Sequence, residues 1–420
     1  MNIYLVIILA ILAGRYIVEI VADYLNIKAI RTEIPPEFSG YLDTDKYAKS
    51  QNYLKDNTLF GVFSDTFDTF TTILFVVYGG FNYVDQLARY FGYGSIVTGL
   101  LFAGILMLAT RVINLPFSIY ETFVLEAKYG FNKTTIKTFV LDIIKSLILL
   151  VIIGTPLFAA ILWLFEDTGS MAWIYCWLTI SIVQILMIFI APYVIMPLFN
   201  KFTPLEDGEL KSAIEAYARA QHFKMKGIFK MDGSKRSAKT NAFFTGFGKS
   251  RRIVLFDTLI EKHTPQELLA VVAHEMGHYK KRHILKAISR SITLTGATLF
   301  LMSLFIGNRE LFAAFKMENI SIYGSLFFFG FLYSPIAMIV SLIENAISRK
   351  HEYEADAYVI QTCGNADAMI SALKKLSVDN LSNLTPHPFK VVMEYGHPPI
   401  LQRIEAIKRL SPPGAVEIIL

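Results

Sequence analysis

The chain has 420 residues and a mass of 47.5 kDa, with 54% hydrophobic residues, 18% charged residues and a mean hydropathy of +0.45. This composition excludes an ordinary soluble multidomain protein and indicates a protein embedded in a lipid bilayer. The formal charge of +5 comes from Lys and Arg between apolar segments, so we expect no nucleic-acid partner. The two cysteines, Cys176 and Cys363, are too few for a disulfide scaffold or a thiolate metal cluster.

Seven apolar stretches are long enough, or nearly so, to cross the hydrocarbon core, which needs about 20 helical residues. In chain order they lie at 3–24, 60–82, 94–117, 139–165, 171–198, 286–306 and 321–347. The first has no basic start and no small-residue cleavage site, so we expect a permanent membrane helix rather than a signal peptide. The predicted divisions are five spans with loops at 1–198, a lobe segment at 199–285, two spans at 286–347 and a second lobe segment at 348–420.

Lys and Arg in the short loops predict the orientation of these spans. The loops at 25–59 and 118–138 carry eight of them, whereas the loops at 83–93, 166–170 and 307–320 carry three. Because cytoplasmic loops are enriched in Lys and Arg, we expect the N-terminus outside and both lobe segments in the cytosol. No internal repeat is visible, which counts against a secondary transporter.

Several charged residues fall within or just inside the ends of the spans. They are Arg15, Glu19, Asp65, Asp68, Arg111, Asp142, Lys145 and Glu344. Each would cost about 2.5–3.5 kcal/mol on insertion scales if it faced lipid. Either they pair between packed helices, or they face a water-filled chamber that the bundle encloses.

The motif with the clearest chemistry lies in a predicted helix over 264–283, which begins with Thr264 before a proline. Within it, His274 and His278 are four residues apart and therefore share one helix face, where two imidazoles can hold one zinc ion. Glu275 can take the proton of a water on that ion, because zinc lowers the pKa of bound water to about 7. A pair of surface histidines is the plain alternative.

A catalytic zinc usually has a third protein ligand, and the segment after the last span offers one. We predict that this span continues into the cytosol as a single helix, where Glu352 and Asp356 share a face and Glu354 points to the other side. Glu352 is the expected third ligand. Asp356 is expected to orient a ligand histidine through its other ring nitrogen, with a plain surface charge as the alternative.

Three β-rich stretches at 228–231, 241–247 and 252–256 precede the metal helix. If Asn241, Ala242, Phe243 and Phe244 form an exposed edge strand, a peptide can add to it by backbone hydrogen bonding. An ordinary packed hairpin is the alternative.

Near the C-terminus, His397 lies on a Gly-His-Pro-Pro turn from which it could donate a hydrogen bond to an oxyanion, and Arg403 follows on a helix. A loop histidine is more often structural, and His387 occupies a similar Pro-His-Pro turn.

Taken together, these segments resemble the type I CAAX prenyl proteases, which are seven-span membrane zinc metalloproteases, over nearly the full chain. The matching stretches are NLPFSIYETFVLEAKYGFN, PLFNKFTPLEDGEL, GSKRSAKTNAFFTGFGKSRRIVLFDTLI, VVAHEMGHYKKRH, SRKHEYEADAYV and GHPPILQRI. The resemblance implies a mainly α, polytopic membrane protein whose seven helices enclose a chamber, with a cytosolic zinc-metalloprotease lobe that contains a small β-sheet.

The resemblance also implies roles for individual residues. One zinc ion is held by His274, His278 and Glu352, with Glu275 as the catalytic glutamate. His397 lies near the reacting carbonyl, Arg403 matches a supporting basic residue more weakly, and the segment from Asn241 matches the substrate-facing strand. The implied activity is removal of the last three residues after a prenylated cysteine.

The expected partners are the bilayer and a peptide or protein substrate, with or without a prenyl group; the sequence sets no oligomeric state. Short outer loops and an ending, GAVEIIL, without a retrieval signal favour a bacterial inner membrane over the endoplasmic reticulum. Two other functions stay open: a quality-control metalloprotease with no prenyl requirement, and a metal or solute transporter.

Overall fold

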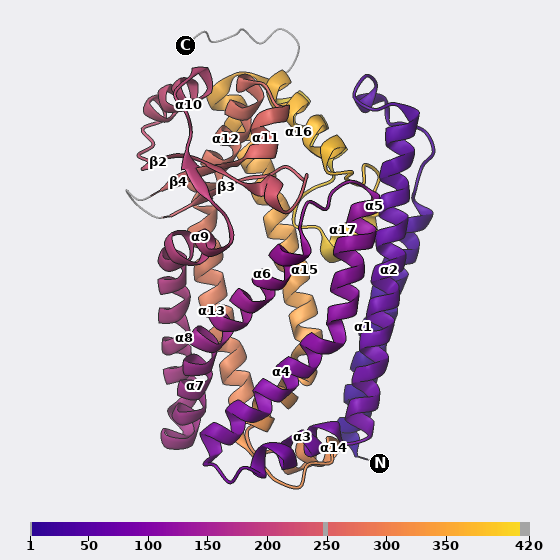
Figure 1. The fold of residues 1–420 in the computed structure, drawn as a ribbon, viewed down its shortest axis with the longest axis vertical. Helices are drawn as coiled ribbons and strands as arrows, with labels where there is room; N and C mark the ends of the chain where they lie inside the picture. Colours follow the sequence, from indigo (N-terminus) through magenta and orange to yellow (C-terminus); the bar gives the residue numbers. More distant parts are fainter. Residues whose placement is uncertain (1, 247–250, 412–420) are drawn as a thin grey trace.

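The computed structural model describes residues 2–246 and 251–411, and its long helices form a bundle that carries a lobe at one end (Figure 1). Seven helices of the described chain are long and apolar enough to cross a membrane, which confirms the predicted number of spans. The N-terminus lies at the end of the bundle opposite the lobe (Figure 1), as an odd number of crossings requires. The predicted strand residue 247 and the GAVEIIL ending lie outside the described residues.

The membrane-crossing helices run in chain order as follows. They are α1 (Ile3–Lys28), α2 (Thr44–Val77), α4 (Ser95–Tyr120) with α5 (Glu126–Lys128), α6 (Ile136–Leu149) with α7 (Thr155–Asp167), α8 (Ala172–Ile190) with α9 (Met196–Phe199), α13 (His283–Ser303) and α15 (Ile322–Cys363). In each of the three helix pairs, a single π-helical turn joins the two helices. These turns lie at Glu121–Leu125, Leu150–Gly154 and Ala191–Ile195. Such turns widen a helix without ending it, so each pair still forms one span.

The second span differs most from its predicted range of 60–82. Helix α2 begins at Thr44 because the Asp43 side chain caps it, accepting a hydrogen bond from the Lys46 amide at 2.7 Å. It ends at Val77, and Gly79, with φ of 76°, redirects the chain into the short helix α3 (Gly80–Arg89). About half of the expected loop at 25–59 is therefore helical. This helical extension is polar, so the search for apolar stretches gave little sign of it.

The end of the bundle far from the lobe is closed by α3 and α14 (Arg309–Ala314) (Figure 1). Aromatic rings join these helices to α15: Phe81 lies 5.5 Å from Phe328, and Phe315 stacks on Phe328 at 4.0 Å between ring centroids. This apolar cluster holds the distal end together.

The intramembrane charges divide between the two expectations. Arg15 pairs with Glu19 at 2.8 Å, Arg290 with Glu344 at 2.8 Å, and Lys145 donates to the Leu198 carbonyl at 2.8 Å. Asp142 receives a two-pronged ion pair from Arg236 of the lobe. Among the described residues, Asp65, Asp68 and Arg111 have no such partner, and a chamber that would hydrate them stays a prediction.

The lobe combines helices with one four-stranded sheet. Its helices are α10 (Glu209–Ala220), α11 (Asp257–Lys262), α12 (Pro265–Lys280), α16 (Ala366–Asp379), α17 (Pro388–Glu394) and α18 (Ile400–Leu410). Its strands are β1 (Phe202–Pro204), β2 (Gly227–Met231), β3 (Ala242–Thr245) and β4 (Arg252–Phe256), in the spatial order β1-β2-β4-β3. Strand β1 was not predicted, because three residues that end in proline carry no readable alternation.

Helix α12 passes through the lobe core, where Ala270, Val272, Ala273 and Met276 are fully or almost fully buried. It ends at Lys280 rather than at the predicted 283. The break is at Arg282, which adopts a left-handed conformation with φ of 59° and starts the next span.

Candidate active site

The site is built on α12, whose start is fixed by a capping box. The Thr264 side chain accepts from the Glu267 amide, and the Glu267 carboxylate accepts from the Thr264 amide at 2.8 Å. Ion pairing with Lys375 of α16 at 2.8 Å anchors the same carboxylate. Burial alone would raise the pKa of Glu267, but the Lys375 and Ser371 hydrogen bonds outweigh it and hold the pKa below its usual range.

Helix α15 extends without interruption from the bundle into the lobe and packs directly on α12 (Figure 1). The close approach depends on Gly277, where an added Cβ would meet the Ala355 Cα at 3.1 Å and the Ala355 carbonyl oxygen at 3.2 Å. Glycine at this position of the His-Glu-Met-Gly-His motif thus lets the two backbones come together. Glu352, one turn before Ala355, is thereby placed against the two histidines.

The three predicted metal ligands converge. His274 Nε2 lies 3.2 Å from His278 Nε2 and 3.4 Å from one Glu352 oxygen, while His278 Nε2 lies 3.3 Å from the other oxygen. One ligand atom of each residue lies within 4.8 Å of the others. Two imidazoles and a carboxylate are a donor set that catalytic zinc uses.

Charge and hydrogen bonding at this trio fit a bound cation. Glu352 is buried and its Oε2 accepts no hydrogen bond from the described residues, although Arg403 Nη1 lies 3.1 Å away. Burial disfavours the protonated ring of His274, but the neighbouring carboxylates of Asp356 and Glu352 outweigh burial and raise the pKa of His274 to about 9. The cluster therefore attracts positive charge, which a metal ion would supply.

Asp356 lies where the sequence placed it, on the face of α15 that carries Glu352. Its Oδ1 is 2.9 Å from His274 Nδ1, the ring nitrogen on the far side from the trio. Arg403 of α18 holds this carboxylate with two hydrogen bonds, of 2.9 Å from Nε and 2.6 Å from Nη2. Arg403 is only 8% exposed. Burial alone would lower the pKa of its guanidinium, but the carboxylates of Asp356 and Glu352 outweigh burial and raise that pKa. Arg403 thus joins Asp356 and Glu352.

A cavity of about 560 Å³ opens beside the trio. Glu275, from α12, lines it, and burial raises the pKa of its carboxyl. His397 lines it from the turn before α18, with Nε2 3.5 Å from a Glu352 oxygen and a side chain that is 73% exposed. Arg349 of α15 secures this turn by donating to the Tyr395 carbonyl at 2.7 Å. The described residues thus place a carboxyl and an imidazole at the same opening.

Strand β3 is the edge of the sheet and pairs with β4 on one side only, within the described strands. Asn241 and Ala242 line the cavity, whereas Phe243 and Phe244 do not. The Phe244 ring instead packs on Phe223 at 5.4 Å in the lobe core. The expected peptide contact uses backbone hydrogen bonds along this strand rather than the two phenylalanine rings, so it stays a prediction. Asn241 is itself just before the strand.

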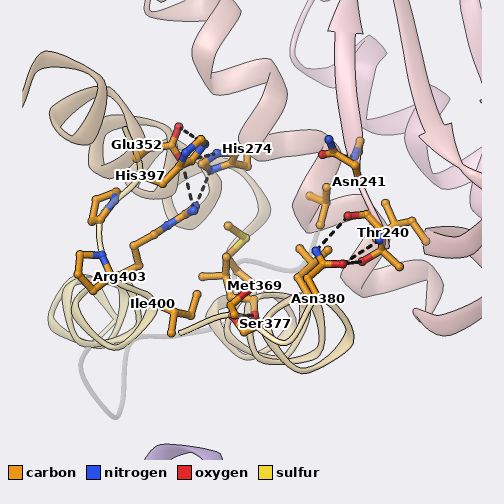
Figure 2. Close-up of a pocket in the computed structure, with 18 of the residues that line it drawn as sticks. Thr240, Asn241, His274, Glu352, Met369, Ser377, Asn380, His397, Ile400 and Arg403 are labelled. Carbon is orange, nitrogen blue, oxygen red and sulfur yellow. Dashed lines mark hydrogen bonds and ion pairs between the residues drawn. The ribbon is translucent and has the colours of Figure 1, made fainter. Parts of the chain in front are cut away.

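Sequence reasoning missed the residue that fixes this edge. Asn380 accepts from the Thr240 amide at 2.9 Å and donates to the Thr240 carbonyl at 3.2 Å. Figure 2 shows Thr240, Asn241 and Asn380 across the cavity from His274, Glu352 and His397. The two segments are 140 residues apart in sequence, and nothing local signals their contact.

The second Pro-His-Pro turn has a different use. His387 is the N-cap of α17, and its Nδ1 accepts from the Phe389 amide at 3.2 Å. It does not line the described cavity.

Comparison with known proteins agrees with the fold. Residues 23–201 match the model of the CAAX prenyl protease N-terminal region with five membrane helices, and residues 204–411 match that of peptidase family M48. The human CAAX prenyl protease 1 homolog is 33% identical, with 90% of each chain covered. CAAX prenyl protease 1 of Saccharomyces cerevisiae is 34% identical, with 91% of this chain and 90% of the relative covered. The crystal structure of Ste24p from S. mikatae superposes with a TM-score of 0.92 and 34% identity, covering 97% and 99% of the two chains.

A helical membrane bundle that carries a His-Glu-Met-Gly-His helix beside an edge strand defines a membrane-embedded metalloprotease. The chain belongs to peptidase family M48, with the N-terminal membrane domain of the CAAX prenyl proteases. The predicted enzyme class and family are confirmed.

Proposed function

We propose that this metalloprotease is a zinc endopeptidase that removes the C-terminal tripeptide after a prenylated cysteine. The observation that carries the proposal is the convergence of His274, His278 and Glu352 at a cavity bounded by an edge strand. The substrate class follows from similarity to proteins named CAAX prenyl protease 1. A chain with that substrate must handle a lipid-bearing peptide, which suits a site joined to membrane helices.

Zinc would be held by His274, His278 and Glu352, and when bound it polarises a carbonyl and makes water a nucleophile near neutral pH. Glu275 lines the same cavity, and its raised pKa suits a carboxyl that takes a proton from the attacking water and returns it to the leaving amine. His397 supplies an N–H to the oxygen of the scissile carbonyl as negative charge develops there.

The substrate would lie extended along the β3 edge. Peptide backbone can pair with an edge strand without regard to sequence, so the strand gives alignment rather than selectivity. Asn241 and Ala242 line the cavity at the start of this edge. The two hydrogen bonds between the Asn380 side chain and the Thr240 backbone hold that start in place. Arg403 and Asp356 support the metal ligands from behind.

The direct test uses two peptides of identical sequence, one farnesylated at the cysteine and one bare. We expect zinc-dependent release of the tripeptide from the farnesylated peptide, loss of cleavage with a chelator, and recovery when zinc is restored. Glu275→Gln is the matched control for contaminating peptidases. Cleavage that survives chelation would refute the metal mechanism.

Equal cleavage of the bare peptide would instead support a quality-control metalloprotease that uses the same residues. Family membership leaves the transporter alternative without support, since an M48 peptidase accounts for Glu275 beside the trio.

The membrane orientation is also proposed. Eight Lys and Arg in the loops at 25–59 and 118–138, against three in the remaining short loops, support an N-terminus outside and a cytosolic lobe. The pairing of Arg236 in the lobe with Asp142 ties that lobe to its span. The host membrane is proposed to be a bacterial inner membrane rather than the endoplasmic reticulum. Fractionation of the native cells tests this proposal.

A further inference from the structure

A chain of hydrogen bonds begins at the ring nitrogen of His278 that faces away from the proposed metal ligands. His278 Nδ1 lies 3.1 Å from Nδ1 of His283, the first residue of α13. The other ring nitrogen of His283, Nε2, lies 2.9 Å from Glu354 Oε2. From the sequence, we expected Glu354 to point to the side of its helix opposite Glu352, and His283 had no expected role.

The chemistry of the three groups fixes where the protons lie. A carboxylate only accepts hydrogen bonds, so His283 must carry its proton on Nε2. The His283 Nδ1 then has a lone pair, which accepts from an N–H at His278 Nδ1. His278 Nε2 is left as a lone pair facing His274 and Glu352, at 3.2 and 3.3 Å.

Local structure holds this arrangement in place. The left-handed Arg282 turns the chain between α12 and α13 and brings His283 back beside His278. The His283 side chain is 4% exposed and stacks on His351 with 3.8 Å between centroids and 9° between planes. Because so little water reaches the ring, protein groups must satisfy its two nitrogens.

We propose that His283 and Glu354 are positioning residues that hold His278 with its Nε2 lone pair directed at the metal. The inference rests on the proposed zinc function. It gives the two histidine ligands separate supports: Asp356 acts on His274 directly, and Glu354 acts on His278 through an intervening imidazole. Such supports hold ring orientation and typically change metal affinity by about 10- to 100-fold when removed.

The test measures zinc affinity of the purified full-length protein by competition with a chromophoric chelator. We expect His283→Leu, which fills the space without polar groups, to lower zinc affinity by about 10- to 100-fold. His283→Gln can accept from His278 and donate to Glu354, so it should stay within about threefold of the parent by the same reasoning. His351→Phe keeps a ring against His283 without entering the chain, and it should leave affinity unchanged.

A second pair of variants covers the case in which His283→Leu does not fold. Glu354→Leu should lower zinc affinity in the same direction, while Lys350→Gln, which removes a lysine 3.9 Å from the same carboxylate, should not. Parental zinc affinity in folded His283→Leu or Glu354→Leu would overturn the proposal, as would equal losses in the Leu and Gln variants of His283. If the parent itself bound no zinc, the proposed function would fail instead, so the two failures are distinguishable.

Discussion

Replacement of Gly277 by Ala tests whether the contact between α12 and α15 builds the site. The added methyl would lie 3.1 Å from the Ala355 Cα, 3.2 Å from the Ala355 carbonyl oxygen and 3.2 Å from the Tyr358 Cβ. Two of these atoms are backbone and cannot rotate away, so the helices must separate by a few tenths of an ångström. Overpacking of this kind costs about 1–3 kcal/mol.

Because Glu352 lies one turn from Ala355, the same shift moves its carboxylate away from the two imidazoles. If about 1.4 kcal/mol of the cost falls on the site, zinc affinity drops about tenfold. The assay is zinc competition with a chromophoric chelator together with thermal unfolding of the zinc-free protein. We expect Gly277→Ala to show both weaker zinc binding and a lower melting temperature.

Gly330→Ala is the matched control, since it lies within α15 and an added Cβ there meets nothing within 4 Å. Alanine has a higher helix propensity than glycine by about 1 kcal/mol, so this change should be neutral or stabilising. The reasoning is refuted if Gly277→Ala behaves like the control in zinc affinity and melting temperature.

Three further predictions concern other parts of the chain. His397→Ala should lower kcat on the farnesylated peptide by about 10²–10³ with zinc retained, as for loss of one oxyanion donor. The control, His387→Ala, should cost only the stability of a helix cap. Equal losses of kcat in the two variants would contradict the oxyanion role of His397. Glu267→Gln should destabilise the lobe by about 1–3 kcal/mol at pH 7. The pKa of Glu267 is lowered in the folded state. The difference in unfolding free energy between the parent and Glu267→Gln should therefore be full above a pH of about 4.5 and fade as acid protonates the parent. A difference that grows in acid would count against this prediction. Cysteines placed at Asp65 and Arg111 should react with water-soluble thiol reagents if the bundle holds a chamber, and complete protection would exclude that chamber.

Local spacing was enough to predict that the candidate metal ligands converge. Four-residue spacing put His274 and His278 on one face, and the same rule selected Glu352 with Asp356 on the second helix. These contacts were predictable because both helices are regular and each supplies its residues within little more than one turn.

The remaining contacts depend on tertiary placement that no local pattern carries. Helix periodicity correctly put Glu354 and Glu352 on different faces of the helix. It could not show that α13 brings His283 into contact with Glu354. Likewise, the Asn380 clamp joins residues 140 positions apart. The packing of the Phe244 ring on Phe223 in the lobe core is another tertiary contact that the strand pattern alone did not indicate.

The central claim is that Glu275 performs the proton transfers at a zinc ion held by His274, His278 and Glu352. It is tested most directly by measuring zinc content and cleavage of the farnesylated peptide side by side in Glu275→Gln and Glu352→Ala. The account predicts one zinc ion per chain without turnover in Glu275→Gln, and loss of both zinc and turnover in Glu352→Ala. Near-parental cleavage by Glu275→Gln, or one tightly held zinc ion per chain in Glu352→Ala, would contradict it.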